Sequence, residues 1–491
     1  MLVAVVALAV LVRATIDFST PLMPKVNGAY YLVQARSFAE MGRLAFNAFP
    51  LVFWLSGALA KTLHIIFGGE LSDSVILACK LVDSILPAFA CVPIYLLARE
   101  WTMKKSSSLW LSAAPALFCV VYYPALVMTS DFQKNAVGMV WFAFVIYFMY
   151  QALDEPRPGR LLTVGVFLFL GSITHVGAFG AMFGYSLAAF GVLLFMRRPS
   201  FRRVLVLLCG AIVLYVVVLG LSHFAAVPRK LEMVLSLIIH PHQLFDNSIV
   251  VNVFSGKRVP ADPLGLLNIV LIDSIAVISG WLVLRKRREI SPAQSVTVIA
   301  AIITCFVLAS PLTNWEFGAG RLFLMGYLPA SVLVAFLIQY SSRRQRAALT
   351  TVVLLVTVGS AIVVFVPVTM TSIPEESLAE LYQLRRYIPA PEKTLVIARH
   401  GLEWWAAWAL RTHVSQEHNI SRQMWNRYDT VLFLRQVADF APFGPMGFGG
   451  PPFNEVQIPR QADVLFEGRY YVLAESDAYP DSYPIRRPAM R

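Results

Sequence analysis

The sequence predicts an all-α polytopic membrane protein followed by a small α/β domain, and three observations lead there. The chain is 57% hydrophobic and 14% charged over 491 residues, whereas a soluble protein would carry about a quarter charged residues. Apolar runs long enough to span a bilayer alternate with short polar segments. Beyond residue 370 the composition becomes mixed polar and aromatic.

The net charge of +12 would indicate nucleic acid binding in a soluble domain. Here the basic residues cluster in short loops between apolar runs, so topology accounts for them and no nucleic acid partner is expected. The five cysteines lie inside apolar runs without CxxC spacing, which predicts neither disulfides nor a zinc site. They are Cys79, Cys91, Cys119, Cys209 and Cys305.

The N-terminal apolar run, residues 2–11, has the length of a signal peptide. It lacks a basic segment before it and a small-residue cleavage site ahead of Asp17, so an uncleaved first membrane helix is expected. Further spans are predicted at 72–97, 108–128, 136–153, 161–173, 179–195, 204–221, 264–284, 296–310, 322–340 and 350–370. Together these give about eleven transmembrane helices.

The apolar run at 49–67 decides the sidedness of everything after it, because Lys61 and His64 interrupt it. If this run does not span, the basic loops all lie on the cytoplasmic side, as the positive-inside rule requires. We therefore predict a juxtamembrane or re-entrant helix, a cytoplasmic N-terminus and an extracytoplasmic C-terminus in the cell membrane. The loops concerned carry Arg99, Lys104, Lys105, Arg157, Arg160, Arg197, Arg198, Arg202, Arg203, Arg285, Lys286, Arg287, Arg288, Arg343, Arg344 and Arg346.

With this topology, the chemically distinctive polar groups gather on the outer face. External loop 1, about residues 14–71, would contain Asp17 and an amphipathic helix capped by Asn27 and ended by Gly42. Arg36 and Glu40 would lie on its polar side. The turns at 130–135 and 174–175 and the loops at 223–262 and 314–321 fall on the same face. This asymmetry predicts an extracytoplasmic site.

Two domains are expected, a transmembrane domain over 1–370 and an extracytoplasmic α/β domain over 371–491. The second has strand-like runs at 394–398, 430–434 and 464–473 and a helix-like stretch at 401–414. Trp404, Trp405 and Trp408 in that stretch suit a domain core better than a sugar platform. Residues 441–452 indicate a loop, and the sequon at 419–421 is meaningful only in a cell that glycosylates asparagine.

The N-terminal pattern resembles membrane glycosyltransferases of the GT-C class, especially protein O-mannosyltransferases and aminoarabinose transferases. The likeness is carried by the first helix, the loop helix with Tyr31 and Gly42 at x(10) spacing, the non-spanning run, and a helix ending in residues 95–99. It implies transfer of a sugar from a polyprenyl-phosphate donor to an acceptor hydroxyl on a lipid, glycan or protein. It also places Tyr31 among the substrate-binding residues.

The chain departs from these families at their Asp-Glu pair, where it has Asn27 and Gly28. Neither residue can act as a base. The external carboxylates that remain as candidate catalytic residues are Asp17 and Asp131, which would have to reach the acceptor hydroxyl. A catalytically inactive homologue serving as a membrane-embedded assembly subunit is the alternative.

Lys80 is the most informative cation, because an ammonium inside an apolar helix normally marks a partner or a function. It could bind the phosphate of the donor, and the alternative is an ion pair with Asp83 on the same helical face. Arg321, after a flexible Gly-Ala-Gly, is a second candidate phosphate ligand or a snorkelling arginine. Lys134 could orient the phosphate or a metal.

Three further positions complete the predicted substrate and metal chemistry. Glu316, next to Trp315, could hydrogen-bond a sugar, and His175 lies in a short external turn. His240 and His242 are weak evidence for a metal because no carboxylate accompanies them at defined spacing. The sequence requires no cofactor, although a divalent metal is compatible with it. Membrane lipids are the remaining expected partners, and no paired set of mid-membrane charges supports a transporter.

Overall fold

The computed structural model describes residues 1–103, 108–197, 240–256, 263–314, 321–416, 420–437, 455–477 and 479. The chain forms two compact units. The helical unit comprises Met1–Thr15, Phe46–Leu55 and Leu81–Phe365, and the sheet unit comprises Ile16–Ala45, Ser56–Lys80 and Val366–Arg491. Most of the segment predicted as external loop 1 thus shares a unit with the C-terminal segment, although residues 46–55 belong to the helical unit.

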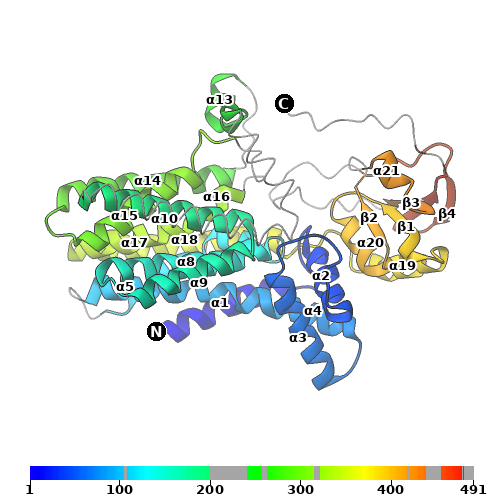
Figure 1. Ribbon diagram of the computed structural model, residues 1–491, viewed down its shortest axis with the longest axis horizontal. Coiled ribbons are helices and arrows are strands. Elements are labelled where there is room, and N and C mark those ends of the chain that lie inside the picture. Colours follow the sequence, from blue (N-terminus) through cyan, green and yellow to red (C-terminus); the bar gives the residue numbers. More distant parts are fainter. Residues whose placement is uncertain are drawn as a thin grey trace. The chain divides into compact units, whose positions relative to one another are not determined.

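The helical unit is built from long apolar helices that run alongside one another (Figure 1). Its helices are α5 (Cys91–Met103), α6 (Trp110–Val121), α7 (Tyr123–Val127), α8 (Gln133–Asp154), α9 (Pro158–Ser172), α10 (Val176–Arg197), α13 (Ile249–Phe254), α14 (Pro263–Lys286), α15 (Pro292–Leu308), α16 (Arg321–Met325) and α17 (Tyr327–Tyr340), with short 3-10 turns η1 (Pro87–Ala90) and η2 (Pro241–Leu244). Four helices cross between the units: α1 (Leu2–Asp17), α3 (Leu51–Phe67), α4 (Leu71–Ile85) and α18 (Arg343–Thr369).

In the described part of the chain, seven helical stretches are long and apolar enough to cross a membrane. They are Leu71–Thr102, Trp110–Val127, Gln133–Asp154, Val176–Met196, Pro263–Lys286, Leu322–Tyr340 and Arg343–Val366, and α3, α9 and α15 are shorter apolar helices. The protein is therefore a multi-pass membrane protein. The predicted span at 204–221 lies outside the described residues, so the count of eleven stays a prediction.

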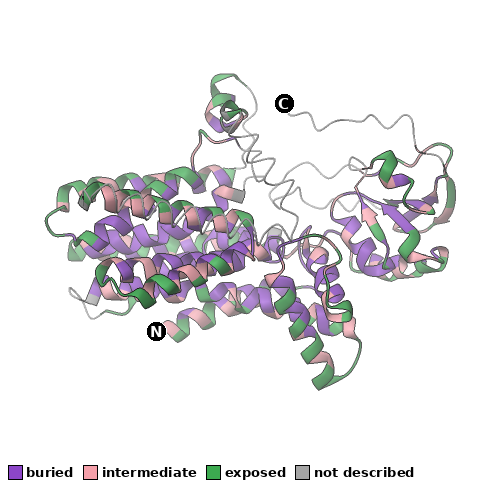
Figure 2. Ribbon diagram, viewed as in Figure 1, coloured by how far each residue is buried: buried purple, intermediate pink, exposed green. Residues whose placement is uncertain are grey.

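The core of the helical unit lies around α17, which is buried along its whole length (Figure 2). Small residues let its neighbours approach closely. A Cβ on Gly138 of α8 would lie within 2.3 Å of the Cβ of Ala178 in α10, so only glycine permits this helix crossing. By contrast, α18 exposes large apolar side chains such as Leu355 and Ile362, as expected of a helix that faces lipid.

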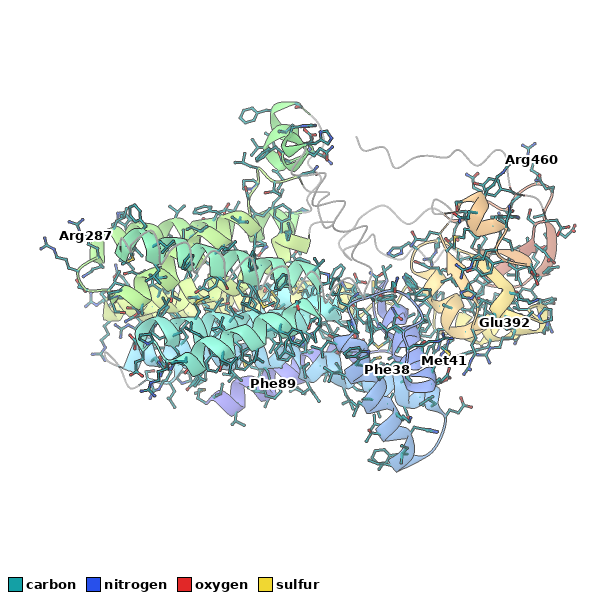
Figure 3. All side chains as sticks on the ribbon, viewed as in Figure 1. Phe38, Met41, Phe89, Arg287, Glu392 and Arg460 are labelled. Carbon is teal, nitrogen blue, oxygen red and sulfur yellow. The ribbon has the colours of Figure 1, made fainter. Side chains whose placement is uncertain are left out.

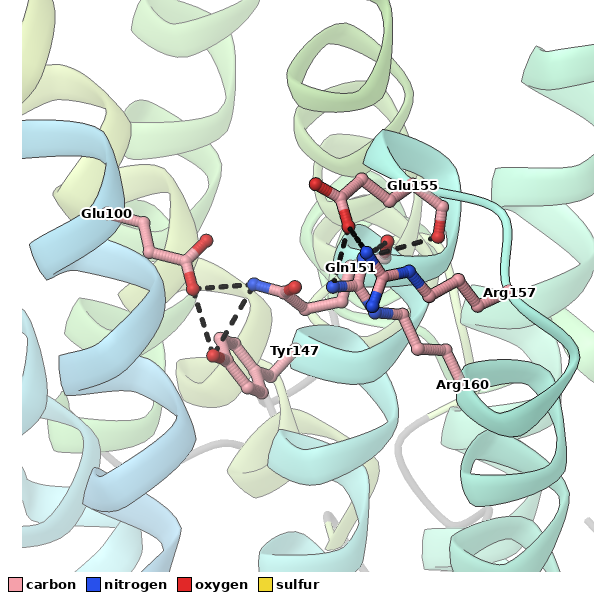
Figure 4. Close-up of polar contacts among 6 residues, drawn as sticks. All are labelled: Glu100, Tyr147, Gln151, Glu155, Arg157 and Arg160. Carbon is pink, nitrogen blue, oxygen red and sulfur yellow. Dashed lines mark hydrogen bonds and ion pairs between the residues drawn. The ribbon is translucent and has the colours of Figure 1, made fainter.

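The turns predicted to be basic and cytoplasmic include the one between α14 and α15, from which Arg287 projects (Figure 3). This turn meets the end of α17, where the Tyr340 hydroxyl donates to the Glu289 carbonyl oxygen at 3.2 Å. At the ends of α5 and α8, the Gln151 amide and the Tyr147 hydroxyl both donate to Glu100 (Figure 4). These contacts tie neighbouring helix ends together, and sidedness itself stays a prediction.

The sheet unit contains α2 (Gly28–Met41), α19 (Ser377–Gln383), α20 (Leu402–Leu410), α21 (Arg422–Trp425), η3 (Leu384–Tyr387), η4 (Pro391–Lys393) and the strands β1 (Thr394–Ile397), β2 (His413–Ser415), β3 (Thr430–Gln436), β4 (Asp463–Glu467) and β5 (Tyr471–Glu475). The strand order is β2-β1-β3-β5-β4. β1 pairs in parallel with β2 and β3, and β5 pairs antiparallel with β3 and β4. The predicted α/β character is confirmed.

Two predicted elements of this unit are each divided in the structure. The run at 464–473 forms a hairpin, because Gly468 and its neighbours turn the chain between β4 and β5. The helix-like stretch at 401–414 ends at Leu410, since Arg411 takes a left-handed conformation with φ 61°, and the chain then enters β2. Trp405 and Trp408 are fully buried, as the core interpretation predicted.

The helix α2 differs from the amphipathic surface helix that the sequence predicts. Nine of its fourteen residues are buried, and it packs against α20, with the rings of Tyr30 and Trp404 4.9 Å apart. Gly42 ends the helix in the left-handed conformation, as predicted, but the Asn27 side chain makes no capping hydrogen bond. Asn27 thus takes the predicted N-cap position without a capping bond from its side chain.

Arg36 was expected on a solvent-facing side of α2 and is instead buried. Its guanidinium donates to the carbonyl oxygens of Ala407 and Trp408 and stacks 4.4 Å from the Trp408 ring. These carbonyls belong to the last turn of α20, where a cation complements the helix dipole. Burial lowers the pKa of Arg36 to about 10, and repulsion from Arg411 adds to that shift.

We expect Arg36→Met to destabilise the protein by about 2 kcal/mol, because it orphans two helix-end carbonyls and removes a charge-assisted pair of hydrogen bonds. Thermal unfolding of the detergent-solubilised chain measures the effect. Arg43→Met is the matched control, since Arg43 is exposed just beyond the same helix. Equal melting temperatures for the two variants would contradict a structural role for Arg36.

Candidate functional site

Lys80 lies in α4 and is almost completely buried, with 3% of its surface exposed. Its ammonium donates to the carbonyl oxygens of Thr20 and Pro21, at 2.5 and 3.4 Å, and lies 5.3 Å from the Phe18 ring centroid. The segment after α1 thus wraps around this cation. An ammonium has three donors, so two carbonyl bonds leave it one for a further acceptor.

Two carboxylates of the sheet unit interact electrostatically with Lys80, namely Asp17 and Glu375. Asp17 is the last residue of α1 and is fully buried. The carboxylate of Glu375 accepts a hydrogen bond from the Thr20 hydroxyl, whose backbone carbonyl in turn accepts from Lys80. The structure therefore brings the predicted base Asp17 and the predicted phosphate ligand Lys80 into one polar group.

The sequence left Asp83 as the alternative partner of Lys80, but Asp83 pairs with Arg13. The Arg13 guanidinium donates to the Asp83 Oδ1 atom at 2.9 Å, to the Asp83 carbonyl at 2.8 Å and to the Ala125 carbonyl at 3.1 Å. Both side chains are buried, with 2% and 0% exposed. This ion pair belongs to the helical unit and leaves Lys80 to the loop carbonyls.

Gly28, the second of the two positions where the resemblance implies a carboxylate, has no room for a side chain. A Cβ on Gly28 would lie 2.6 Å from the Met23 Cβ and 3.1 Å from the Met23 carbonyl oxygen. Because real Cβ contacts are essentially never this short, the backbone there is shaped around glycine. Tyr31, the predicted substrate-binding residue of the same helix, is buried with 3% exposed and meets the Tyr30 ring edge to face at 5.5 Å.

We expect Gly28→Glu to lower the melting temperature, because the new Cβ must displace the Met23 backbone. A loss of about 1 to 3 kcal/mol is typical of such overpacking. Asn27→Asp is the matched control, since it changes charge without adding volume. Unchanged thermal unfolding of Gly28→Glu would show that the segment can adapt to a carboxylate.

The second predicted base, Asp131, follows α7 in a tight turn of the helical unit. It is buried, with 2% exposed, and its N–H donates to the Thr129 carbonyl oxygen at 2.7 Å. Ser130 takes a left-handed conformation with φ 62°, which costs free energy in any residue with a Cβ. The Ser130 N–H donates to the Asp83 carboxylate, so the Arg13–Asp83 pair fixes this turn and thereby positions Asp131.

Lys134 and His175 lie on neighbouring parts of the helical unit. The Lys134 ammonium is 5.2 Å from the centroid of the Phe53 ring. His175 is buried in the turn between α9 and α10, where its Nδ1 atom accepts from the N–H groups of Gly177 and Ala178. The adjacent Thr174 accepts a hydrogen bond from the Trp141 indole of α8 at 3.0 Å. Because its ring accepts from the first N–H groups of α10, His175 caps the N-terminus of that helix.

Some predicted positions fall where the structure gives no side-chain description. Glu316 and Trp315 lie outside the described residues, as does Asn419 of the sequon. Arg321 begins α16, but its side chain is not described. Within the described ranges no group of three or more histidine, cysteine or acidic side chains could hold a metal ion. The rings of His240 and His242 lie 5.9 Å apart.

Sequence reasoning missed Arg13, although the signal was present. Arg13 is a cation inside the first apolar run, and the argument that singled out Lys80 applies to it equally. It also missed Thr20 and Glu375, which are far apart in the chain and carry no motif. Only the fold brings such residues together.

The described architecture has the fold of a solved membrane protein, ArnT. It matches a crystal structure of ArnT from Cupriavidus metallidurans bound to undecaprenyl phosphate, with a TM-score of 0.56, 13% identity, and coverage of 96% of this chain and 97% of that one. The apo ArnT structure gives a TM-score of 0.54 at 12% identity, again with 96% and 97% coverage. No protein-family model and no curated protein matches the chain in sequence. The resemblance therefore establishes the fold.

Proposed function

We propose that this protein is an integral membrane glycosyltransferase that takes a sugar from a polyprenyl-phosphate carrier. The observation that carries the proposal is the buried ammonium of Lys80, which interacts electrostatically with the buried carboxylate of Asp17, in a chain with the fold of ArnT. An ArnT structure of this fold holds undecaprenyl phosphate. A lysine ammonium is a suitable point-charge ligand for the phosphate of such a carrier.

In the proposed reaction, the oxygen of an acceptor hydroxyl attacks the anomeric carbon as the bond from that carbon to the phosphate oxygen breaks. The polyprenyl phosphate leaves with the bonding electrons, and the hydroxyl proton passes to a carboxylate. Lys80 stabilises the negative charge that develops on the departing phosphate. Asp17 or Asp131 accepts the proton, and the configuration at the anomeric carbon inverts.

The acceptor hydroxyl belongs to a lipid, glycan or protein on the extracytoplasmic face. We base this sidedness on the distribution of the basic loops along the sequence. Arg321, which begins α16, is the proposed second phosphate ligand. His175, Lys134, Glu316 and Tyr31 complete the proposed substrate-binding set.

A second candidate function rests on residues 27 and 28. Gly28 stands where the family has a carboxylate, and a Cβ there would clash with Met23. Restoring the carboxylate would therefore require the neighbouring residues to move as well. A membrane-embedded assembly subunit with the GT-C fold and no transferase activity would have this property. It predicts binding to partner proteins without sugar transfer.

The test is transfer of radiolabelled sugar from a panel of polyprenyl-phosphate donors, in membranes that contain the protein. Membranes with the Lys80→Met variant at equal abundance are the matched control, because methionine keeps the length of the side chain and removes its charge. Transfer by the wild-type chain that falls at least about tenfold in the variant supports the proposal. No transfer from any donor supports the assembly subunit.

A further inference from the structure

Three polar side chains near the start of α8 are buried without a hydrogen-bond partner in the described part of the chain. They are Thr129 through its Oγ1 atom, Gln133 through both its Oε1 and Nε2 atoms, and Asn135 through its Nδ2 atom. The exposed fractions are 0%, 0% and 2%. We call these three residues the amide cluster. All three residues lie in the helical unit, with Thr129 before Asp131 in the chain and Gln133 and Asn135 after it.

Such a cluster is unusual, because buried polar groups in folded proteins are almost always hydrogen-bonded. The free-energy cost of burying a polar group without a hydrogen bond is greatest for Gln133, because its amide leaves both a donor and an acceptor unpaired. Gln151, a polar residue of the same helix, shows the usual situation, in which the side-chain amide is hydrogen-bonded. Gln151 of α8 donates to Glu100 and to the Tyr147 hydroxyl (Figure 4). A fold that keeps Gln133 unbonded retains it for a ligand.

The chemistry of the cluster favours an uncharged polyhydroxylated ligand. Amides and hydroxyls both donate and accept, as sugar hydroxyls do. A phosphate would meet the buried carboxylate of Asp131 in the same turn, whereas a sugar hydroxyl would not be repelled by it.

We propose that the amide cluster binds the hydroxyl groups of the sugar carried by the donor. The inference rests on the proposed transferase function and adds the subsite that distinguishes one sugar from another. Gln133 is its central residue, since both ends of its amide are available to a hydroxyl pair. A site built to hydrogen-bond hydroxyls discriminates strongly, because the wrong sugar leaves its buried groups unpaired.

The first arm of the test needs no ligand. Gln133→Met replaces an unbonded buried amide with an apolar side chain of similar size, so we expect the melting temperature of the detergent-solubilised protein to rise by about 3 °C. Gln151→Met is the matched control on the same helix and should lower it, because its amide is bonded. A lower melting temperature for Gln133→Met would show that another part of the chain bonds Gln133, and would overturn the inference.

The second arm measures thermal stabilisation by polyprenyl phosphate alone and by the same carrier loaded with each of a panel of sugars. We expect one loaded carrier to bind wild-type protein at least about tenfold more tightly than the bare carrier. Gln133→Met should lose this difference and keep its affinity for the bare carrier. A sugar preference that survives in the variant, or no preference in the wild type, overturns the inference. If the bare carrier fails to bind the wild type, the proposed function itself fails.

Discussion

Replacing Asp83 with asparagine is expected to destabilise the protein by about 3 to 5 kcal/mol, the cost of leaving a buried charge unpaired. Asp83 is fully buried and neutralises Arg13, which is 2% exposed. The variant removes the negative charge while Arg13 stays enclosed by the Ala125 carbonyl and the Asp83 backbone. Thermal unfolding in detergent, followed by tryptophan fluorescence, measures the loss.

The double variant Arg13→Met/Asp83→Leu separates the charge from the packing. Since apolar replacement of a whole buried ion pair is often nearly neutral, we expect the double variant to recover most of the lost stability. Glu289→Gln is the surface control, because the Lys286–Glu289 pair is largely exposed and such pairs contribute less than about 1 kcal/mol. An Asp83→Asn variant no less stable than Glu289→Gln would contradict the buried ion pair.

The double variant Arg13→Met/Asp83→Leu has a second consequence, which concerns the candidate site. Asp83 also accepts the N–H of Ser130, whose φ of 62° is unfavourable without such support. The leucine at position 83 of the double variant has no acceptor, so the turn should be released and Asp131 displaced. The double variant, although stable, would not restore this hydrogen bond. Stability recovered without activity would therefore identify Asp83 as a positioning residue for Asp131.

Patterns of local origin were predictable from the sequence. Apolar runs of membrane length, the αL glycine at residue 42 and the strand segments at 394 and 430 each depend on a few neighbouring residues, and the structure confirms them. The burial of Lys80 was also predictable, because a charge within an apolar helix has few alternatives to a partner or a function.

The partners of those charges were not predictable, because they come from distant parts of the chain. Lys80 meets carbonyls of residues 20 and 21, and Arg36 meets those of residues 407 and 408. The sequence pattern of α2 indicated a solvent-facing side, and α20 covers that side instead. The spacing of apolar residues along a helix indicates which of its faces is polar. Which other element covers that face depends on the tertiary fold.

Of the two candidate bases, Asp17 should account for most of the proton transfer. The base and the phosphate ligand must both lie near one anomeric carbon, and Asp17 is a carboxylate that interacts electrostatically with Lys80. We expect Asp17→Asn to reduce the transfer rate by about 10²- to 10⁴-fold, the usual contribution of a positioned general base. Donor affinity should change little, so the loss should appear in kcat rather than in KM.

Glu375→Gln is the matched control for this loss, because it removes a second negative charge that interacts with Lys80. Glu375 is exposed and hydrogen-bonds Thr20, so its effect on kcat should be small. If both variants lowered the rate equally, the two carboxylates would act by tuning the charge of Lys80 and neither would be the base. A large loss in Asp131→Asn together with an active Asp17→Asn would assign proton transfer to the α7–α8 turn, and the Arg13–Asp83 pair would then be the structure that positions the catalytic group.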